Sequence, residues 1–123
     1  MTNPELNPET LLRLGATSRS FEAGEKVFLE NETGDALYIV RSGRIDIITY
    51  GTVLENVRPG GIFGEMALVD DTPRSAAAMA AEQSEVIAIT KPTFLALIRE
   101  QPDFALLVMH TMAARIRRMN QQL

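Results

Sequence analysis

The chain has 123 residues, of which 46% are hydrophobic, and a chain of this size suits a single globular domain spanning residues 1–123. Its net charge of −4 argues against direct nucleic-acid binding, because phosphate backbones are bound by basic surfaces. The absence of cysteine excludes disulfides, thiolate metal sites and cysteine nucleophiles, so we expect a cytoplasmic protein.

The N-terminal lead-in, residues 1–17, and the middle of the chain, residues 18–90, differ in their pattern of apolar residues. Residues 1–17 contain two prolines and no long apolar run, so we expect a helical or irregular segment that is neither a secretory signal nor a membrane anchor. Residues 18–90 carry short apolar runs that partly alternate with polar residues, as half-buried strands do. These runs are 26–29, 36–41, 45–50, 52–57, 75–81 and 85–89. Because glycine turns separate them, we predict a mainly β fold with flanking helices.

The periodicity becomes helical in residues 91–123. Pro92 lies near the start of a first helix, and a second helix begins at Pro102 and Asp103 and continues without glycine or proline. Apolar residues follow it at spacings of four and three, the period of a coiled-coil seam. They are Ala105, Met109, Met112, Ile116, Met119 and Leu123. We expect the first part to pack on the chain's own strands and the part beyond Thr111 to form a homodimer seam, with packing inside one chain as the alternative.

One stretch has the composition of an anion site. Its glycines allow close backbone approach, and residues 65–68 predict one helical turn with free N–H groups. The Arg74 guanidinium can meet two phosphate oxygens at once. Glu65 would repel a phosphate unless it accepts a hydrogen bond, for example from a sugar hydroxyl. A ligand with a phosphate and a sugar hydroxyl explains both residues, and a purely structural ion pair between them is the alternative.

Residues 63–68 and 73–76 resemble the phosphate-binding cassette of cyclic nucleotide-binding domains. Upstream residues 21–25, 32–35, 38–40 and 42–45 are similar to the family's opening strand and following hairpin, so the resemblance covers about 18–122. It implies a double-stranded β-helix, a jelly-roll-like barrel, followed by a long C-terminal helix. The cassette residues that it identifies as ligand-binding are Phe63, Gly64, Glu65, Met66, Ala67, Arg74, Ser75 and Ala76.

The resemblance also implies a role for several of these side chains. Arg74 would pair with the cyclic phosphate, aided by Ser75 and the backbone N–H of Ala76, and Glu65 would accept the ribose 2′-hydroxyl. On the last helix, Met119 would be an apolar lid and Asn120 a candidate base reader. Ser75 favours cyclic AMP, since relatives selective for cyclic GMP tend to carry threonine there; cyclic GMP is the alternative ligand.

The resulting hypothesis is a ligand-responsive regulatory module that performs no chemistry. One alternative is a dimerisation or docking module that keeps the fold without binding nucleotide, and another is a metal-dependent enzyme on a similar β-roll. Metal ligation is not expected, because Asp70 and Asp71 are adjacent acids in a polar loop and His110 is the only histidine. The arginines at positions 115, 117 and 118 are interpreted as a solvated helix face. The effector partner is not specified by the sequence.

Overall fold

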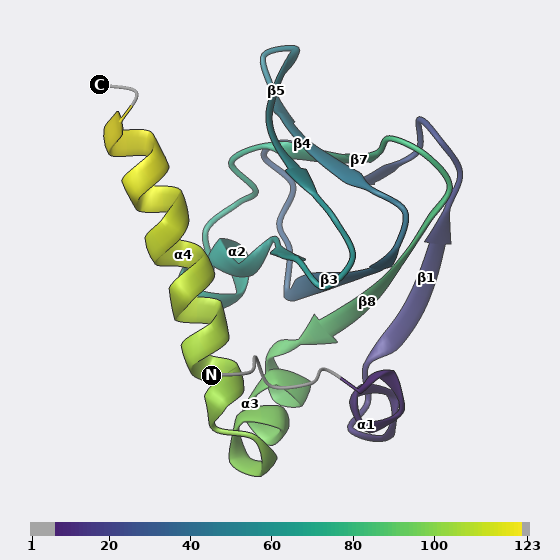
Figure 1. The fold of residues 1–123 in the computed structure, drawn as a ribbon, viewed down its shortest axis with the longest axis vertical. Helices are drawn as coiled ribbons and strands as arrows, with labels where there is room; N and C mark the ends of the chain where they lie inside the picture. The colour runs from purple at the N-terminus through teal and green to yellow at the C-terminus, as the bar shows by residue number, and fades with distance from the viewer. Residues whose placement is uncertain (1–6, 122–123) are drawn as a thin grey trace.

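The computed structural model describes residues 7–121 and shows a two-sheet β-roll with helices packed along one side and one end (Figure 1). In the first sheet the strand order is β1 (Thr17–Phe21), β8 (Ser84–Thr90), β3 (Ala36–Ser42) and β6 (Ile62–Phe63). In the second sheet it is β2 (Lys26–Phe28), β7 (Ala77–Ala80), β4 (Ile45–Thr49) and β5 (Thr52–Val57). The helices are α1 (Pro8–Arg13), α2 (Glu65–Asp70), α3 (Lys91–Glu100) and α4 (Asp103–Gln121).

The predicted mainly β fold with a long C-terminal helix is confirmed. All the strand pairs are antiparallel, and within residues 7–121 none of them joins the two sheets, so the roll is open rather than a closed barrel. The β4–β5 hairpin turns at Tyr50 and Gly51, whose φ values of 49° and 74° suit the two-residue turn that matches strand twist. Two strands, β1 and the two-residue β6, are not among the runs that the apolar pattern predicts.

Two apolar clusters hold the molecule together, one inside the roll and one between the roll and the helices. Strands β3 and β8 contribute to both, because successive side chains point to opposite faces. Tyr38 and Val40 face the roll interior, whereas Leu37 and Ile39 face the helices. Residues buried on both faces explain why these strands read as nearly continuous apolar runs.

The C-terminal helices cover the second cluster. Phe104 and Val108 at the start of α4 are buried, and the Phe104 ring lies 5.8 Å from that of Phe94 in α3, measured between centroids. The expected packing of the first part of the helix on the chain's own strands is therefore confirmed. Beyond Thr111 the described side chains of α4 are only partly buried or exposed, and the homodimer seam expected there stays a prediction. Leu123, at the end of the predicted seam, and positions 1–6 of the lead-in lie outside them.

The lead-in contains a short helix. Pro8 opens α1, and the Asn7 side chain accepts a hydrogen bond of 2.9 Å from the Glu9 N–H at its N-terminus. Leu11 is buried in the second cluster, which fixes α1 against the roll. None of the helices within residues 7–121 combines the length and the apolar character that a membrane span requires.

We predict that Phe104→Ala destabilises the protein by about 3 kcal/mol or more, because it removes a fully buried ring and leaves a cavity. Urea unfolding followed by circular dichroism measures the change. The matched control is Leu106→Ala on the same helix, where the side chain is 58% exposed and a change below about 1 kcal/mol is expected. Equal losses for the two variants would contradict this account of the core.

Candidate functional site

The site begins at a sharp change of chain direction after β6. Gly64 has φ 76°, a left-handed conformation that few other residues adopt, and α2 starts at the next residue. The following loop returns to the roll at Arg74, whose backbone N–H donates to the Glu32 carbonyl at 2.8 Å and whose carbonyl accepts from the Asn31 N–H at 2.8 Å. The cassette backbone is therefore pinned to the loop that follows β2.

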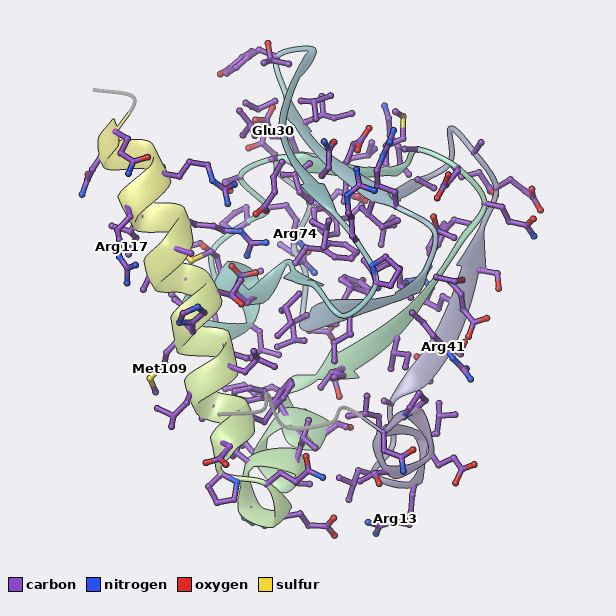
Figure 2. The ribbon with its side chains drawn as sticks, viewed as in Figure 1. Arg13, Glu30, Arg41, Arg74, Met109 and Arg117 are labelled. Atoms are coloured by element: carbon purple, nitrogen blue, oxygen red, sulfur yellow. The ribbon has the colours of Figure 1, made fainter. Side chains whose placement is uncertain are left out.

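The Arg74 side chain lies inside the roll, where only 5% of the residue is exposed (Figure 2). Its two terminal nitrogens donate to the carbonyls of Gly64, at 2.7 Å, and Ala36, at 2.8 Å. Its guanidinium carbon lies 4.2 Å from the centroid of the Phe28 ring, which is a cation–π distance. Its Nε is buried without a hydrogen bond, and no carboxylate within residues 7–121 forms an ion pair with it.

The electrostatic consequence is a buried positive charge with little compensation. Burial lowers the pKa of Arg74 from its ordinary value, although Tyr38 and Asp35 partly oppose the shift. A guanidinium remains protonated even so. Two glycines make room for it: a Cβ on Gly34 would lie 2.4 Å from the Arg74 Nε, and a Cβ on Gly64 would lie 2.8 Å from its Nη1.

Glu65 is the second charged group of the site, and its partner is an arginine from α4. The residue is 2% exposed, and its Oε1 forms an ion pair with Arg115 Nη1. Arg115 also donates from Nη2 to the Ile62 carbonyl at 2.6 Å and from Nε to Glu55 at 2.9 Å. Burial alone would lower the pKa of Arg115, but the charges and hydrogen bonds of Glu65 and Glu55 outweigh burial, so the pKa is raised. The structure thus does not support an ion pair between Glu65 and Arg74.

Two adjoining cavities lie between the cassette, β5 and α4. The smaller, of about 110 Å³, is lined by the cassette together with residues from β2, β4, β5 and α4. Its lining residues are Phe28, Ile47, Glu55, Phe63, Gly64, Glu65, Met66, Ala67, Pro73, Arg74, Ser75, Ala76 and Arg115. The larger, of about 370 Å³, is lined by Ile47, Leu54, Glu55, Glu65, Met66, Ser75, Ala76, Met112, Arg115, Ile116, Arg118 and Met119. The structure therefore brings all the cassette residues predicted from the sequence around one cavity.

The two residues predicted on α4 are placed differently. Met119 lines the larger cavity and is 65% exposed, as a lid at the mouth would be. Asn120 is exposed and belongs to the lining of neither cavity. Its role as a base reader stays a prediction.

The sequence analysis missed Arg115, and its interpretation as a solvated residue is wrong. Its side chain is only 22% exposed, because it reaches back to Glu65 and Glu55. The signal was its spacing: Arg115 follows Met112 by three residues and precedes Met119 by four, which puts all three on one face of a helix. Arg117, by contrast, points away from the roll (Figure 2).

No group of three or more histidine or acidic side chains within residues 7–121 is arranged to hold a metal ion. The polar groups that line the cavities are instead arginines, carboxylates and one hydroxyl, a set suited to an anion with hydroxyl groups. Such a set can bind and orient a ligand through charge and hydrogen bonds.

Comparison with known proteins identifies a family whose ligands carry a phosphate and a sugar hydroxyl, as this set of polar groups requires. The family model described as "Cyclic nucleotide-binding domain" matches residues 18–101. The chain belongs to this family. This cyclic nucleotide-binding domain is similar to the cyclic AMP receptor protein of Thermus thermophilus, with 37% identity over 105 residues. The alignment covers 81% of the chain. The chain spans 47% of that receptor, about half of its length.

Solved structures give the same result for the cyclic nucleotide-binding domain. The catabolite activator protein of Thermus thermophilus superimposes with a TM-score of 0.80 at 34% identity, covering 96% of this chain and 59% of its own. A structure from work on a cyclic-GMP-dependent signalling pathway in bacterial phytopathogenesis gives a TM-score of 0.74 at 31% identity. It covers 98% of this chain and 95% of its own.

We predict that Arg115→Ala destabilises the domain by about 2 kcal/mol, because it leaves the buried Glu65 carboxylate without its cation. In a Glu65→Gln background the same substitution is expected to cost less, about 1 kcal/mol, since no unpaired charge remains. Urea unfolding of the four proteins gives the coupling between the two residues.

Arg117→Ala is the matched control for this cycle, and a change within about 0.5 kcal/mol is expected from it. Equal costs of Arg115→Ala in the two backgrounds would mean that the contact with Glu65 carries none of the effect.

Proposed function

We propose that the chain binds a 3′,5′-cyclic nucleotide, preferring cyclic AMP to cyclic GMP, and acts as a ligand-responsive regulatory module. The observation that carries the proposal is Arg74, a buried guanidinium with no carboxylate partner among residues 7–121. A buried charge of this kind is costly until an opposite charge meets it. The singly charged phosphate of a cyclic nucleotide supplies that charge, and Ser75 and Ala76 beside Arg74 add hydrogen-bond donors.

The ribose is assigned to Glu65. Its Oε1 is paired with Arg115, whereas its Oε2 accepts no hydrogen bond from the described residues. A carboxylate oxygen with free lone pairs suits the 2′-hydroxyl, which is a donor. This arrangement also accounts for a carboxylate so close to a phosphate site, because Arg115 offsets its charge.

The larger cavity is assigned to the base. Most of its lining is apolar, with side chains such as Leu54, Met112 and Ile116. Guanine carries a carbonyl, a ring N–H and an amine that all need partners, and polar groups without partners are costly to bury. Adenine needs fewer, which supports cyclic AMP. The similarity to a structure from cyclic-GMP-dependent signalling makes cyclic GMP the competitor that any test must include.

Regulation is assigned to α4, because this helix supplies Arg115 to the ligand site. A ligand shifts an equilibrium only when it binds one arrangement more tightly than another. A nucleotide that contacts Glu65 and Arg115 together favours the arrangement in which α4 lies against the cassette. We further propose that the roll, up to Thr90, and the helices from Lys91 act as one binding unit that lacks catalytic activity.

The first test of this function is thermal unfolding with cyclic AMP, cyclic GMP and 5′-AMP. We expect cyclic AMP at ~100 times its Kd to add about 2.7 kcal/mol of stability. Arg74→Ala is expected to weaken binding by about a hundredfold or more, because the phosphate loses its cation.

The matched control is Arg41→Ala, since Arg41 lies on the side of the molecule away from the cavities (Figure 2) and is expected to leave ligand binding unchanged. A larger shift with cyclic GMP would reassign the ligand within the same class. No shift with any of the nucleotides at millimolar concentration would contradict nucleotide binding and support the dimerisation or docking alternative.

We also propose that α4 forms a homodimer seam. Its exposed apolar side chains Leu106, Met109 and Ile116 follow a spacing of three and seven residues, as in a two-helix coiled coil. Met109→Glu is expected to convert a dimer into a monomer, because the charge would be buried in the seam, and Met109 lines neither cavity. Light scattering coupled to size exclusion measures the mass, with Arg117→Glu beside the seam as the control. A monomeric wild type at high micromolar concentration would contradict this proposal.

A further inference from the structure

An ion pair at the mouth of the larger cavity has no role in the function proposed so far. Glu55 on β5 lines both cavities, and Arg118 on α4 lines the larger one. Arg118 Nη1 donates to Glu55 Oε1 at 3.1 Å, while Glu55 Oε2 accepts from Arg115 at 2.9 Å. The Glu55 side chain is 20% exposed and that of Arg118 is 45% exposed. The pair therefore spans the boundary between cavity and solvent.

Glu55 and Arg118 are the polar residues of the larger cavity that the ribose and the phosphate do not use. The polar residues in the lining of the larger cavity are Glu55, Glu65, Ser75, Arg115 and Arg118. Glu65 and Arg115 form one ion pair, which serves the ribose, and Ser75 lies beside Arg74 at the phosphate. Glu55 and Arg118 are then the side chains left in that lining for the polar edge of the base.

Both members keep hydrogen-bonding capacity. A carboxylate oxygen has two acceptor sites, and Glu55 Oε1 accepts one N–H, from Arg118. Arg118 has four further N–H donors and, within residues 7–121, makes no other hydrogen bond through its side chain. The pair thus presents an acceptor and a donor side by side.

We propose that Glu55 and Arg118 read the edge of the base: Glu55 accepts from an exocyclic amine, and Arg118 donates to the adjacent ring nitrogen. The inference rests on the proposed nucleotide function and deepens it. Adenine fits this pattern on either edge, because its amine lies between two ring nitrogens. The Hoogsteen edge of guanine does not, since it offers two acceptors.

A structural ion pair alone would not discriminate among bases. Exposed pairs contribute little to stability, and a closing contact between β5 and α4 would act on every ligand alike. A reading pair instead penalises a base without the amine, because the second acceptor site of Glu55 Oε1, which Arg118 does not occupy, is then covered and left without a donor. Sites built to hydrogen-bond a ligand group reject analogues that lack it.

The deciding experiment compares cyclic AMP with purine riboside 3′,5′-cyclic monophosphate, which differs from it only by the missing amine. Isothermal titration calorimetry on the wild-type chain gives both Kd values. We expect cyclic AMP to bind at least about tenfold more tightly, as for a hydrogen bond to a charged acceptor. A ratio near one overturns the proposal, and this comparison requires no variant to fold.

Two variants then separate the roles. Glu55→Ala is expected to reduce the ratio to near one, whereas Arg118→Ala weakens both ligands severalfold and keeps the ratio, because both retain the ring nitrogen. Arg117→Ala, the matched control on α4, leaves both values unchanged. An unchanged ratio in Glu55→Ala overturns the amine contact. Failure of both ligands to bind the wild type would instead overturn the nucleotide function itself.

Discussion

The buried charge of Arg74 constrains the rest of the site. A guanidinium can lie inside this roll only because the chain surrounds it with two carbonyls, an aromatic ring and glycines that leave space for it. Each of these features comes from a different part of the chain: Phe28 from β2, Gly34 from the loop after it and Gly64 from the turn into α2. The position of this single charge therefore depends on several elements of the roll at once, and the candidate site is a property of the whole fold.

The second charged group links the roll to the helices. Glu65 is buried at the start of α2, and its cation is delivered by Arg115 from a helix fifty residues further along the chain. The same arginine holds the Ile62 carbonyl, so α4, β6 and the cassette meet at one side chain. The proposed ligand site and the contact that positions the helix consequently share atoms. A regulatory role then needs no separate route of communication between the two.

Local patterns in the sequence predicted most of the fold, and the resemblance to a known cassette predicted the residues of the candidate site that lie between Phe63 and Ala76. The runs of β3, β4, β5 and β8 and the two C-terminal helices carry their own periodicity, and the glycines mark the turns. β6 was missed because two residues between glycines show no alternation. Arg115 and Glu55 were missed because each has its partner in a distant element. The local sequence around an arginine on a helix does not show whether its side chain contacts solvent or a carboxylate. The openness of the roll depends on strand pairing, which apolar patterns do not encode.

The way α4 is attached has a consequence for how the protein responds to its surroundings. The first turns of the helix are anchored by Phe104 and Val108, in a contact that depends on apolar burial. The later turns are attached by the ion pairs of Arg115 and Arg118 with Glu55 and Glu65. Mobile ions screen exposed charges over about 10 Å at 0.1 M but leave apolar contacts largely intact. Ionic strength therefore acts on one half of this helix, and the more exposed pair, at Arg118, loosens before the buried one.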